Sequence, residues 1–146
     1  MPDGNHSPSP LLRDQLCFAL YATSRAFTKV YADLLKDIGI TYPQYLVLLV
    51  LWEQGPLTVQ SVARELEIES PTATPLIKRM EAMGLVKRTR CIDDERRVLV
   101  SLTDKANSYR DIAARIPERL GCAVKVTDAQ AGQLLTELTK IRDGIG

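Results

Sequence analysis

A cysteine near the start of the chain stands among hydroxyl side chains at helical spacing. Cys17 is followed by Tyr21, Ser24, Thr28 and Tyr31 at steps of four, three, four and three residues, which places all five on one face of a helix. Hydroxyl groups that donate hydrogen bonds stabilise a thiolate, and low thiol pKa makes a cysteine oxidisable. The pattern indicates an oxidisable thiol, although a cysteine on an apolar helix is more often a small packing residue.

Tyr31 is too far along the helix to contact Cys17 of its own chain. The fourteen residues between them span about 21 Å of straight α-helix. Two copies of this helix packed antiparallel would bring Tyr31 of one chain to Cys17 of the other. If Tyr31 affects the thiol, the protein is therefore a dimer.

The other two cysteines are Cys91 and Cys122. Cys122 would resolve a sulfenic acid on Cys17 by forming a disulfide if the two Cα atoms came within about 7 Å, which sequence spacing leaves open. Cys91 has no polar cluster around it and is interpreted as incidental. The one histidine, His6, lies in a Pro/Ser-rich tail, which argues against histidine-based zinc sites and Ser-His-Asp catalysis. This composition disfavours most hydrolases. Our overall expectation is a protein with no metal site, no cofactor and no enzymatic activity.

Composition favours one globular domain, with 146 residues of which 45% are hydrophobic and 25% charged. The net charge of +1 means that any surface that binds a polyanion must be local. The longest apolar run, residues 45–52, is far shorter than the roughly 18 to 20 residues that a membrane span needs. With no secretory signal evident, we expect a cytoplasmic protein without membrane contacts, whose thiols are kept reduced.

Periodicity and capping residues predict four helices in the first half of the chain. Residues 1–10 carry three prolines and are expected to form a flexible tail. A helix follows from residue 11 to about residue 36. A second begins at Thr41, with Gln44 completing a capping box, and its all-apolar sequence places it at the centre of the fold. Thr58 caps a short third helix, and Ser70 is expected to cap the fourth, which contains Pro75 and ends at Gly84.

The second half predicts a hairpin and two further helices. Residues 85–90 and 97–102 have strand character, joined by the charged turn 92–95. Thr103 begins the next helix, which is expected to break around Pro117 and Gly121. Thr127 with Gln130 caps the last helix, which carries an apolar stripe formed by Leu134, Leu135, Leu138 and Ile141.

This order predicts a mainly α (α+β) fold, a winged helix-turn-helix with flanking terminal helices. Residues 41–102 would form the DNA-binding region. Residues 11–40 and 103–146 would supply dimerisation helices, since they are longer and more apolar than so small a core requires.

The predicted fourth helix and hairpin carry the side chains expected to contact DNA. Small polar residues open the helix, and five cations face one anion across residues 78–90, a local charge of +4. Asp94 is expected to hold the Arg96 guanidinium in a geometry suited to a minor groove. A solvated surface is the alternative for charge runs alone. The candidate DNA-binding residues are Ser70, Thr72, Thr74, Lys78, Arg79, Arg88, Arg90, Asp94, Arg96 and Arg97.

Four segments together resemble the MarR family of winged-helix repressors, and within it the branch of organic hydroperoxide resistance regulators. They are QLCFALYATSRAFTKVY (15–31), GITYPQYLVLLVLWEQGPLTV (39–59), ESPTATPLIKRMEAMGLVKRTR (69–90) and DDERRVLVSLT (93–103). The first two are specific to the peroxide-sensing branch. Pro75 also matches the family, whereas Pro71 replaces a small residue, usually glycine.

The resemblance implies a homodimer that represses a peroxidase gene from an inverted-repeat operator and leaves double-stranded DNA when an organic hydroperoxide oxidises Cys17. It implies that Tyr31 and Tyr42 of the partner chain hydrogen-bond this thiol and that Tyr21 belongs to the same pocket. Cys122 stands where the two-cysteine subclass has the residue that forms an intersubunit disulfide.

Two other functions fit parts of the sequence. A repressor that binds a phenolic or lipophilic effector between the same helices would need Cys17 only for packing. A thiol peroxidase would share the sulfenate chemistry, but no Thr/Arg pair of the peroxidase type flanks Cys17, and such an enzyme has no use for a winged helix.

Overall fold

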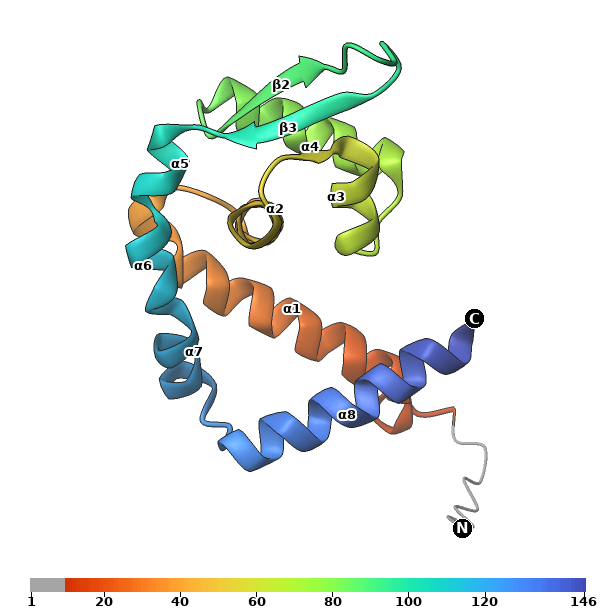
Figure 1. The fold of residues 1–146 in the computed structure, drawn as a ribbon. Coiled ribbons are helices and arrows are strands. Elements are labelled where there is room, and N and C mark those ends of the chain that lie inside the picture. Colours follow the sequence, from red (N-terminus) through yellow and green to blue (C-terminus); the bar gives the residue numbers. More distant parts are fainter. Residues whose placement is uncertain (1–9) are drawn as a thin grey trace.

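A winged helix-turn-helix body stands on two long terminal helices in the computed structural model, which describes residues 10–146 (Figure 1). The tail expected over residues 1–10 thus lies outside the described residues except for its last position. The elements are α1 (Leu16–Leu34), α2 (Tyr42–Gln54), β1 (Leu57–Thr58), α3 (Val59–Glu65), α4 (Ser70–Ala82), β2 (Val86–Arg90), β3 (Val98–Leu102), α5 (Asp104–Ser108), α6 (Arg110–Ala114), α7 (Ile116–Val124) and α8 (Asp128–Ile145).

The predicted first helix is divided into three pieces. A 3-10 turn (Leu12–Asp14) precedes α1, because Gln15 between them has an extended backbone. After α1 a second 3-10 turn (Lys36–Ile38) ends at Gly39, whose φ of 65° lies in the left-handed region that favours glycine. Only the last turns of α1 reach the core, and residues 16–21 in its first turns are exposed.

Helix α2 crosses the centre of the fold, as its apolar sequence predicts. Its capping box is confirmed, because the Thr41 hydroxyl accepts from the Gln44 backbone N–H and the Gln44 side chain accepts from the Thr41 backbone N–H. Val47, Leu48 and Leu51 are buried. The expectation of burial on every side is wrong for Leu49, which is 38% exposed because that side of α2 faces an open pocket beside α6.

Helices α3 and α4 form the predicted helix-turn-helix. The Thr58 cap of α3 is confirmed by a hydrogen bond from the Ser61 backbone N–H to the Thr58 hydroxyl. Ser70, however, is not the N-cap of α4. Helical hydrogen bonds already begin at the Glu69 carbonyl, which accepts from Thr72 and Ala73, so the cap lies one residue earlier. Pro71 at the second position needs no partner because it has no N–H.

The predicted hairpin is confirmed, and it belongs to a three-stranded antiparallel sheet in the order β1-β3-β2. Val86 pairs with Leu102 and Arg90 with Val98 along β2 and β3. Strand β1 was missed, because two residues are too few to show alternation. Its Leu57 pairs with Val100 and thereby connects the start of α3 to the hairpin of β2 and β3, which we call the wing.

The helix predicted after Thr103 runs as α5, α6 and α7, which form a column along one side of the molecule (Figure 1). It breaks at Tyr109 and again at Arg115, and the second break places Pro117 in the first turn of α7, where a proline is tolerated. The expected break at Gly121 is wrong, since α7 continues to Val124. A glycine inside a helix costs only about 1 kcal/mol relative to alanine.

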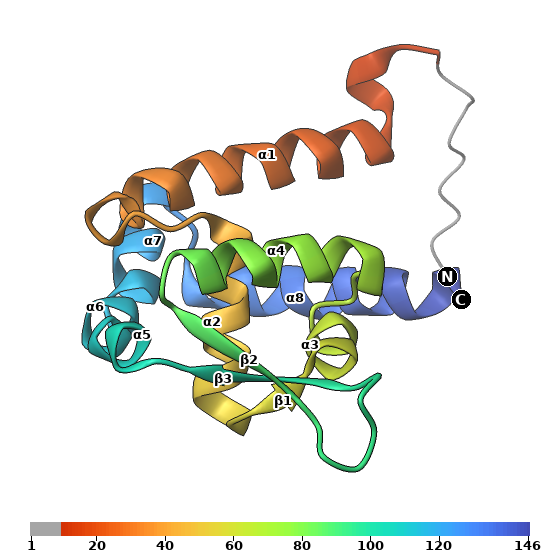
Figure 2. The same ribbon diagram turned by 90° about the horizontal axis from the view of Figure 1, so that it is seen from above.

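Helix α8 begins with the predicted Thr127–Gln130 capping box and leaves its apolar stripe exposed. Figure 1 shows α1 and α8 on the same side of the winged-helix body, and Figure 2 shows α1 at the edge of the body and α8 behind it. One ion pair joins the far end of α8 to the turn between α3 and α4: Arg142 Nη1 donates to Glu67 Oε2 at 3.1 Å. Within residues 10–146, no helix is long and apolar enough to cross a membrane.

Candidate thiol site and nucleic-acid interface

Cys17 lies on the exposed first turn of α1, with few partners in its own chain. Tyr21, one turn later, accepts a hydrogen bond from Arg25 Nη1 at 2.9 Å, and the Arg25 guanidinium lies 5.5 Å from the centre of its ring. The Thr28 hydroxyl donates to the Ser24 carbonyl at 3.0 Å. The hydroxyl face predicted beside Cys17 therefore exists, but its Thr28 hydroxyl is used by the helix itself.

Tyr31 and Tyr42 come together at the opposite end of α1. Their rings stack with centroids 4.2 Å apart and planes 27° apart. Tyr45, one turn further along α2, joins them at 5.7 Å from Tyr31 and 6.4 Å from Tyr42. These three residues form what we call the tyrosine cluster. They pack against the core, so their positions are fixed by the body of the protein rather than by α1 alone.

Tyr45 was missed by sequence reasoning. It is only 3% exposed and contacts both other rings. The signal was present in the sequence, because Tyr42 and Tyr45 are three residues apart and share one side of a helix. In an apolar run, the sequence does not distinguish a tyrosine of the site from a tyrosine that only packs in the core.

The environment of the cluster favours the protonated phenols. Burial, followed by the neighbouring Tyr42 and Tyr45, raises the pKa of Tyr31 to about 12. Burial likewise raises the pKa of Tyr42 and, together with Tyr42, that of Tyr45. The three hydroxyls therefore remain hydrogen-bond donors at neutral pH. Among the described residues no side-chain hydrogen bond involves them. The half-buried Tyr31 and Tyr42 hydroxyls can therefore donate to an external acceptor, whereas Tyr45 is buried beneath them.

Cys122 lies near this same end of α1, within α7. It lines an open pocket of about 530 Å³ together with Leu34, the last residue of α1. Cys17 precedes Leu34 by seventeen residues of helix, about 25 Å. A disulfide needs Cα atoms within about 7 Å, so Cys17 and Cys122 of one chain are not paired in this conformation. Cys91 is half-buried where β2 meets the hairpin turn.

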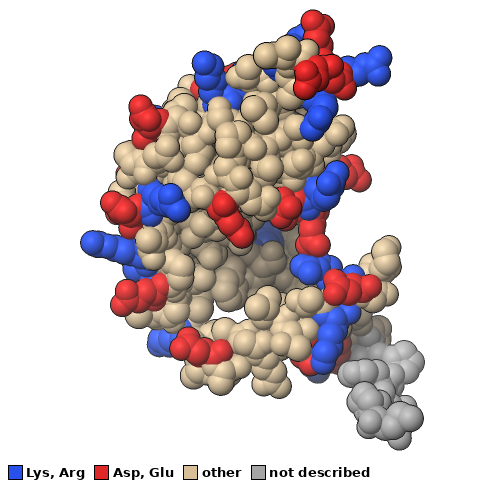
Figure 3. Space-filling model, viewed as in Figure 1, with Lys and Arg blue, Asp and Glu red and all other residues tan. Residues whose placement is uncertain are grey.

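The start of α4 presents fewer free hydroxyls than predicted. The Thr74 hydroxyl donates to the Ser70 carbonyl at 3.0 Å, and both residues are half-buried. Thr72, Lys78 and Arg79 are exposed. On the face of the molecule shown in Figure 3, basic and acidic side chains are intermixed, and the surface is hollowed above α8.

Arg88 is bound within the protein and is not a free cation. Its Nε and Nη2 each lie 3.1 Å from Glu81 Oε1, and its backbone N–H donates to Glu81 Oε2 at 2.9 Å. The backbone bond first, and then the guanidinium, lower the pKa of Glu81. This contact joins α4 to β2. Glu81 is the one anion already subtracted in the local charge of +4, so the pair engages one of the five cations without changing that sum.

The predicted bond between Asp94 and the Arg96 guanidinium is absent from the described residues. Asp94 Oδ1 instead accepts from the Arg96 backbone N–H at 3.0 Å, and the Asp94 carbonyl accepts from the Arg97 N–H at 3.0 Å. An aspartate that accepts from a backbone N–H two residues on stabilises a turn. Asp94 therefore shapes the wing, while Arg90, Arg96 and Arg97 remain exposed.

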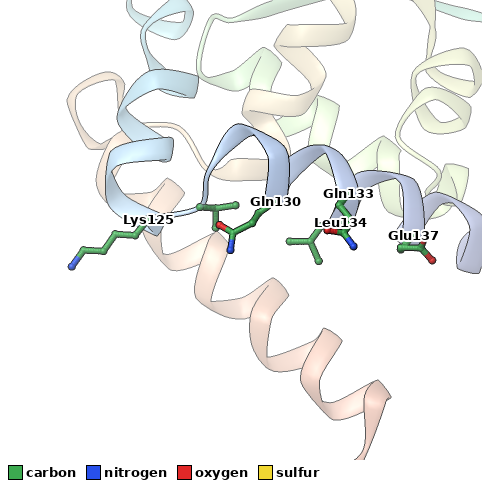
Figure 4. A pocket seen from close by; sticks show the side chains of 6 residues that line it. Lys125, Gln130, Gln133, Leu134 and Glu137 are labelled. Carbon is green, nitrogen blue, oxygen red and sulfur yellow. The ribbon is translucent and has the colours of Figure 1, made fainter. Parts of the chain in front are cut away.

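A further pocket, of about 410 Å³, lies where α7 turns into α8 (Figure 4). Lys125 extends away from Gln130, Gln133 and Glu137, so the pocket does not gather charges of one kind. It lies outside both the cysteine region and the helix-turn-helix.

Comparison with known proteins places this geometry among transcriptional regulators. Residues 29–112 match the family described as transcriptional regulator SarA/Rot. The organic hydroperoxide resistance transcriptional regulator of Bacillus subtilis (strain 168) is 51% identical over 106 residues, which cover 73% of this chain and 72% of that protein.

Two solved structures of AbfR, a protein of Staphylococcus epidermidis, have the same fold. Reduced AbfR bound to DNA is 36% identical, covers 92% of this chain and 94% of its own, and superposes with a TM-score of 0.77. Disulfide-formed AbfR is 38% identical, covers 92% and 91%, and has a TM-score of 0.65.

These similarities confirm the winged-helix fold and the resemblance to the MarR family and its organic hydroperoxide branch. They also agree with the expectation of a regulator rather than an enzyme, because the relatives are named as transcriptional regulators. The chain belongs to the SarA/Rot family of transcriptional regulators, which are winged-helix proteins of the MarR type.

Proposed function

We propose that this protein is a homodimeric, DNA-binding repressor that detects organic hydroperoxides through Cys17 and then releases its operator. The single observation that carries the proposal is the placement of Tyr31, Tyr42 and Cys122 at one end of α1, with Cys17 at the other end. Within one chain, Cys17 is too far from Tyr31, Tyr42 and Cys122 to interact with them. If two α1 helices pack antiparallel, Cys17 of one chain lies beside these three residues of the other.

The exposed apolar side chains support such a dimer. Apart from Leu49, Ile92 and Ile112, the large exposed hydrophobic residues of the described chain lie in residues 11–21 or on α8. Exposed apolar patches of this kind mark interfaces. In the proposed dimer, residues 11–40 and 103–146 form the interface, and residues 41–102 bind DNA.

The chemistry begins with the Cys17 thiolate in a cytoplasm that keeps it reduced. The sulfur attacks the distal oxygen of the hydroperoxide, the O–O bond breaks, and the alcohol leaves with a proton, which gives a sulfenic acid. The partner's Tyr31 and Tyr42 hydroxyls donate hydrogen bonds that stabilise the thiolate. The Cys122 thiolate of the other subunit then attacks the sulfenic sulfur, which forms the disulfide and releases water.

Disulfide formation would change the packing of α1 against α7, and with it the spacing of the two α4 helices. Half-sites in DNA lie about 34 Å apart, so a shift of a few ångströms costs several contacts at once. In this proposal α4 and the wing read an inverted repeat in double-stranded DNA. Thr72, Lys78 and Arg79 act from α4, while Arg90, Arg96 and Arg97 act from the wing.

The relatives support the redox part of the proposal. The Bacillus subtilis relative is named for organic hydroperoxide resistance, and AbfR has been solved in reduced, disulfide-formed and overoxidised states. The present fold superposes better on reduced, DNA-bound AbfR (TM-score 0.77) than on the disulfide form (0.65). This difference fits a chain with separated cysteines that is poised to bind DNA.

The experiment is a mobility-shift titration with a duplex selected from a random pool by the wild-type protein. We expect cumene hydroperoxide to release wild type reversibly and to leave Cys17→Ser bound. Cys122→Ser should respond but overoxidise, because no thiol captures its sulfenic acid. Cys91→Ser is the matched control and should behave as wild type. Release of Cys17→Ser by peroxide would overturn the sensing role of Cys17.

A second candidate, regulation by a phenolic or lipophilic effector, has one observation in its favour. Tyr45, Leu49 and Trp52 line a pocket of about 540 Å³ between α2 and α6, and Trp52 Nε1 is buried without a hydrogen-bond acceptor among the described residues. Release of both wild type and Cys17→Ser by a phenol in the absence of peroxide would favour this function.

A further inference from the structure

The tip of the wing carries a large apolar side chain that is fully exposed among the described residues 10–146. Ile92 is 100% exposed, and it is the one large exposed hydrophobic residue in the wing. The hairpin projects away from the body, with its tip far from α1 and α8 (Figures 1 and 2). Ile92 therefore adds nothing to the packing of this chain and lies far from the apolar faces of the proposed dimer interface.

The position of Ile92 is nevertheless defined by hydrogen bonds on both sides. The Cys91 N–H donates to the Arg97 carbonyl at 2.9 Å, which closes the loop just before Ile92. Asp94 then accepts from the N–H groups of Arg96 and Arg97, as described above. These bonds order the backbone on both sides of Ile92, whose side chain lies in solvent.

The charges of the tip do not by themselves explain how it would approach DNA. Residues 92–97 contain two arginines and three acidic side chains, so the tip has a formal charge of −1. Arg90 stands exposed just behind the tip. Arg90 can thus attract the phosphate backbone. The net negative charge of residues 92–97 gives the tip no such attraction, so any contribution of the tip to DNA affinity must come from another interaction.

We propose that Ile92 enters the minor groove of the operator and packs against its deoxyribose walls, where it contributes apolar contact area and sensitivity to groove shape. The inference rests on the proposed DNA-binding function and deepens it. Proteins that bind the minor groove often place an isoleucine, leucine or phenylalanine there. In this arrangement Arg96 and Arg97, at the other end of the same turn, contact the phosphates.

The test measures affinity by fluorescence anisotropy at several salt concentrations, with the selected duplex and with reduced protein. We expect Ile92→Ala to bind about ten-fold more weakly, because much of a side chain of this size is no longer buried. The slope of log K against log salt should not change, since no phosphate contact is lost. Ile92→Leu, which keeps the same carbon count, should bind as wild type.

Arg96→Ala is the matched charge variant, and it should make the salt slope shallower by about one. Equal affinity for Ile92→Ala and wild type, while Arg96→Ala shows this change, would overturn the role of Ile92 and leave DNA binding intact. A lower affinity of Ile92→Ala accompanied by a lower Tm would overturn it as well. If the wild-type protein selects no duplex, the proposed function itself fails.

Discussion

The ring of Tyr31 near the end of α1 stacks on the ring of Tyr42 at the start of α2, with centroids 4.2 Å apart. The contact closes the bend formed by the 3-10 turn and Gly39, and it fixes two phenol groups on one surface. Because Tyr45 supports both rings from the core, the phenols are ordered before any thiol arrives. In the proposed dimer this preorganised pair receives Cys17 of the partner.

Removal of the phenol hydroxyls tests whether they act on the thiol. We expect Tyr31→Phe and Tyr42→Phe to fold normally, because the stacked rings remain. Each should slow the oxidation of Cys17 about ten-fold, the loss typical of one hydrogen bond to a charged group. The rate is followed by mass spectrometry of dimedone-trapped sulfenic acid. Tyr109→Phe, outside the tyrosine cluster, should react as wild type, and equal rates in all variants would refute the role of the cluster.

The raised pKa values predict how the tyrosines titrate with pH. The absorbance at 295 nm should show the cluster phenols ionising later than ordinary tyrosines, with Tyr31 near pH 12. An unfolded tyrosine loses its proton near pH 10, so between these values the unfolded chain ionises first. Stability therefore falls as pH rises through this window. Tyr31→Phe should remove the latest phase, and its persistence would mean that another residue is responsible.

Arg88 and Arg90 are neighbours with opposite expected roles. Arg88→Ala should lower Tm, because it breaks the contact with Glu81 that joins α4 to β2. The contribution of this pair should fade as pH falls through the lowered pKa of Glu81, below its ordinary value of 4.5. Arg90→Ala should leave Tm unchanged and make the salt slope of DNA binding shallower by about one. A lower Tm for Arg90→Ala and a shallower salt slope for Arg88→Ala, each without the other change, would contradict this interpretation of the wing.

The stripe on α8 is expected to stabilise the dimer. Leu135 is 69% exposed in the single chain, so a charge there costs the monomer little. In a packed interface the same charge would be buried without a partner and strongly disfavoured. Leu135→Glu should shift sedimentation from dimer toward monomer and weaken DNA binding. The exposed Thr136→Glu, on the side of α8 away from the stripe, is the control, and a dimer that survives Leu135→Glu would place the interface elsewhere.

Local rules predicted much of the fold. Thr41 with Gln44, Thr58, and Thr127 with Gln130 cap helices where their spacing indicated, since capping depends on neighbours within four residues. The errors have two sources. The two-residue strand β1 depends on its pairing with β3, which no short window contains. The start of α4 and the break at Arg115 involve neighbours within four residues, but no side-chain cap marks either position.

The candidate site divides in the same way. The sequence spacing alone showed that Tyr31 cannot contact Cys17 of its own chain, and that a contact between them would require a second chain. It could not show that Arg88 is bound by Glu81, seven residues earlier, or that Asp94 serves the turn rather than a guanidinium. Tyr45 was missed because a buried tyrosine and a core residue have the same sequence pattern.

The most direct test of the central claim uses two complementary variants in a Cys91→Ser background. Cys17→Ser and Cys122→Ser chains are mixed, allowed to exchange subunits, treated with cumene hydroperoxide and weighed intact under non-reducing, denaturing conditions. A mixed dimer then holds Cys17 on one chain and Cys122 on the other. The account predicts a covalent dimer of twice the 16.3 kDa chain mass that appears only in the mixture. Exclusively monomeric products would contradict it.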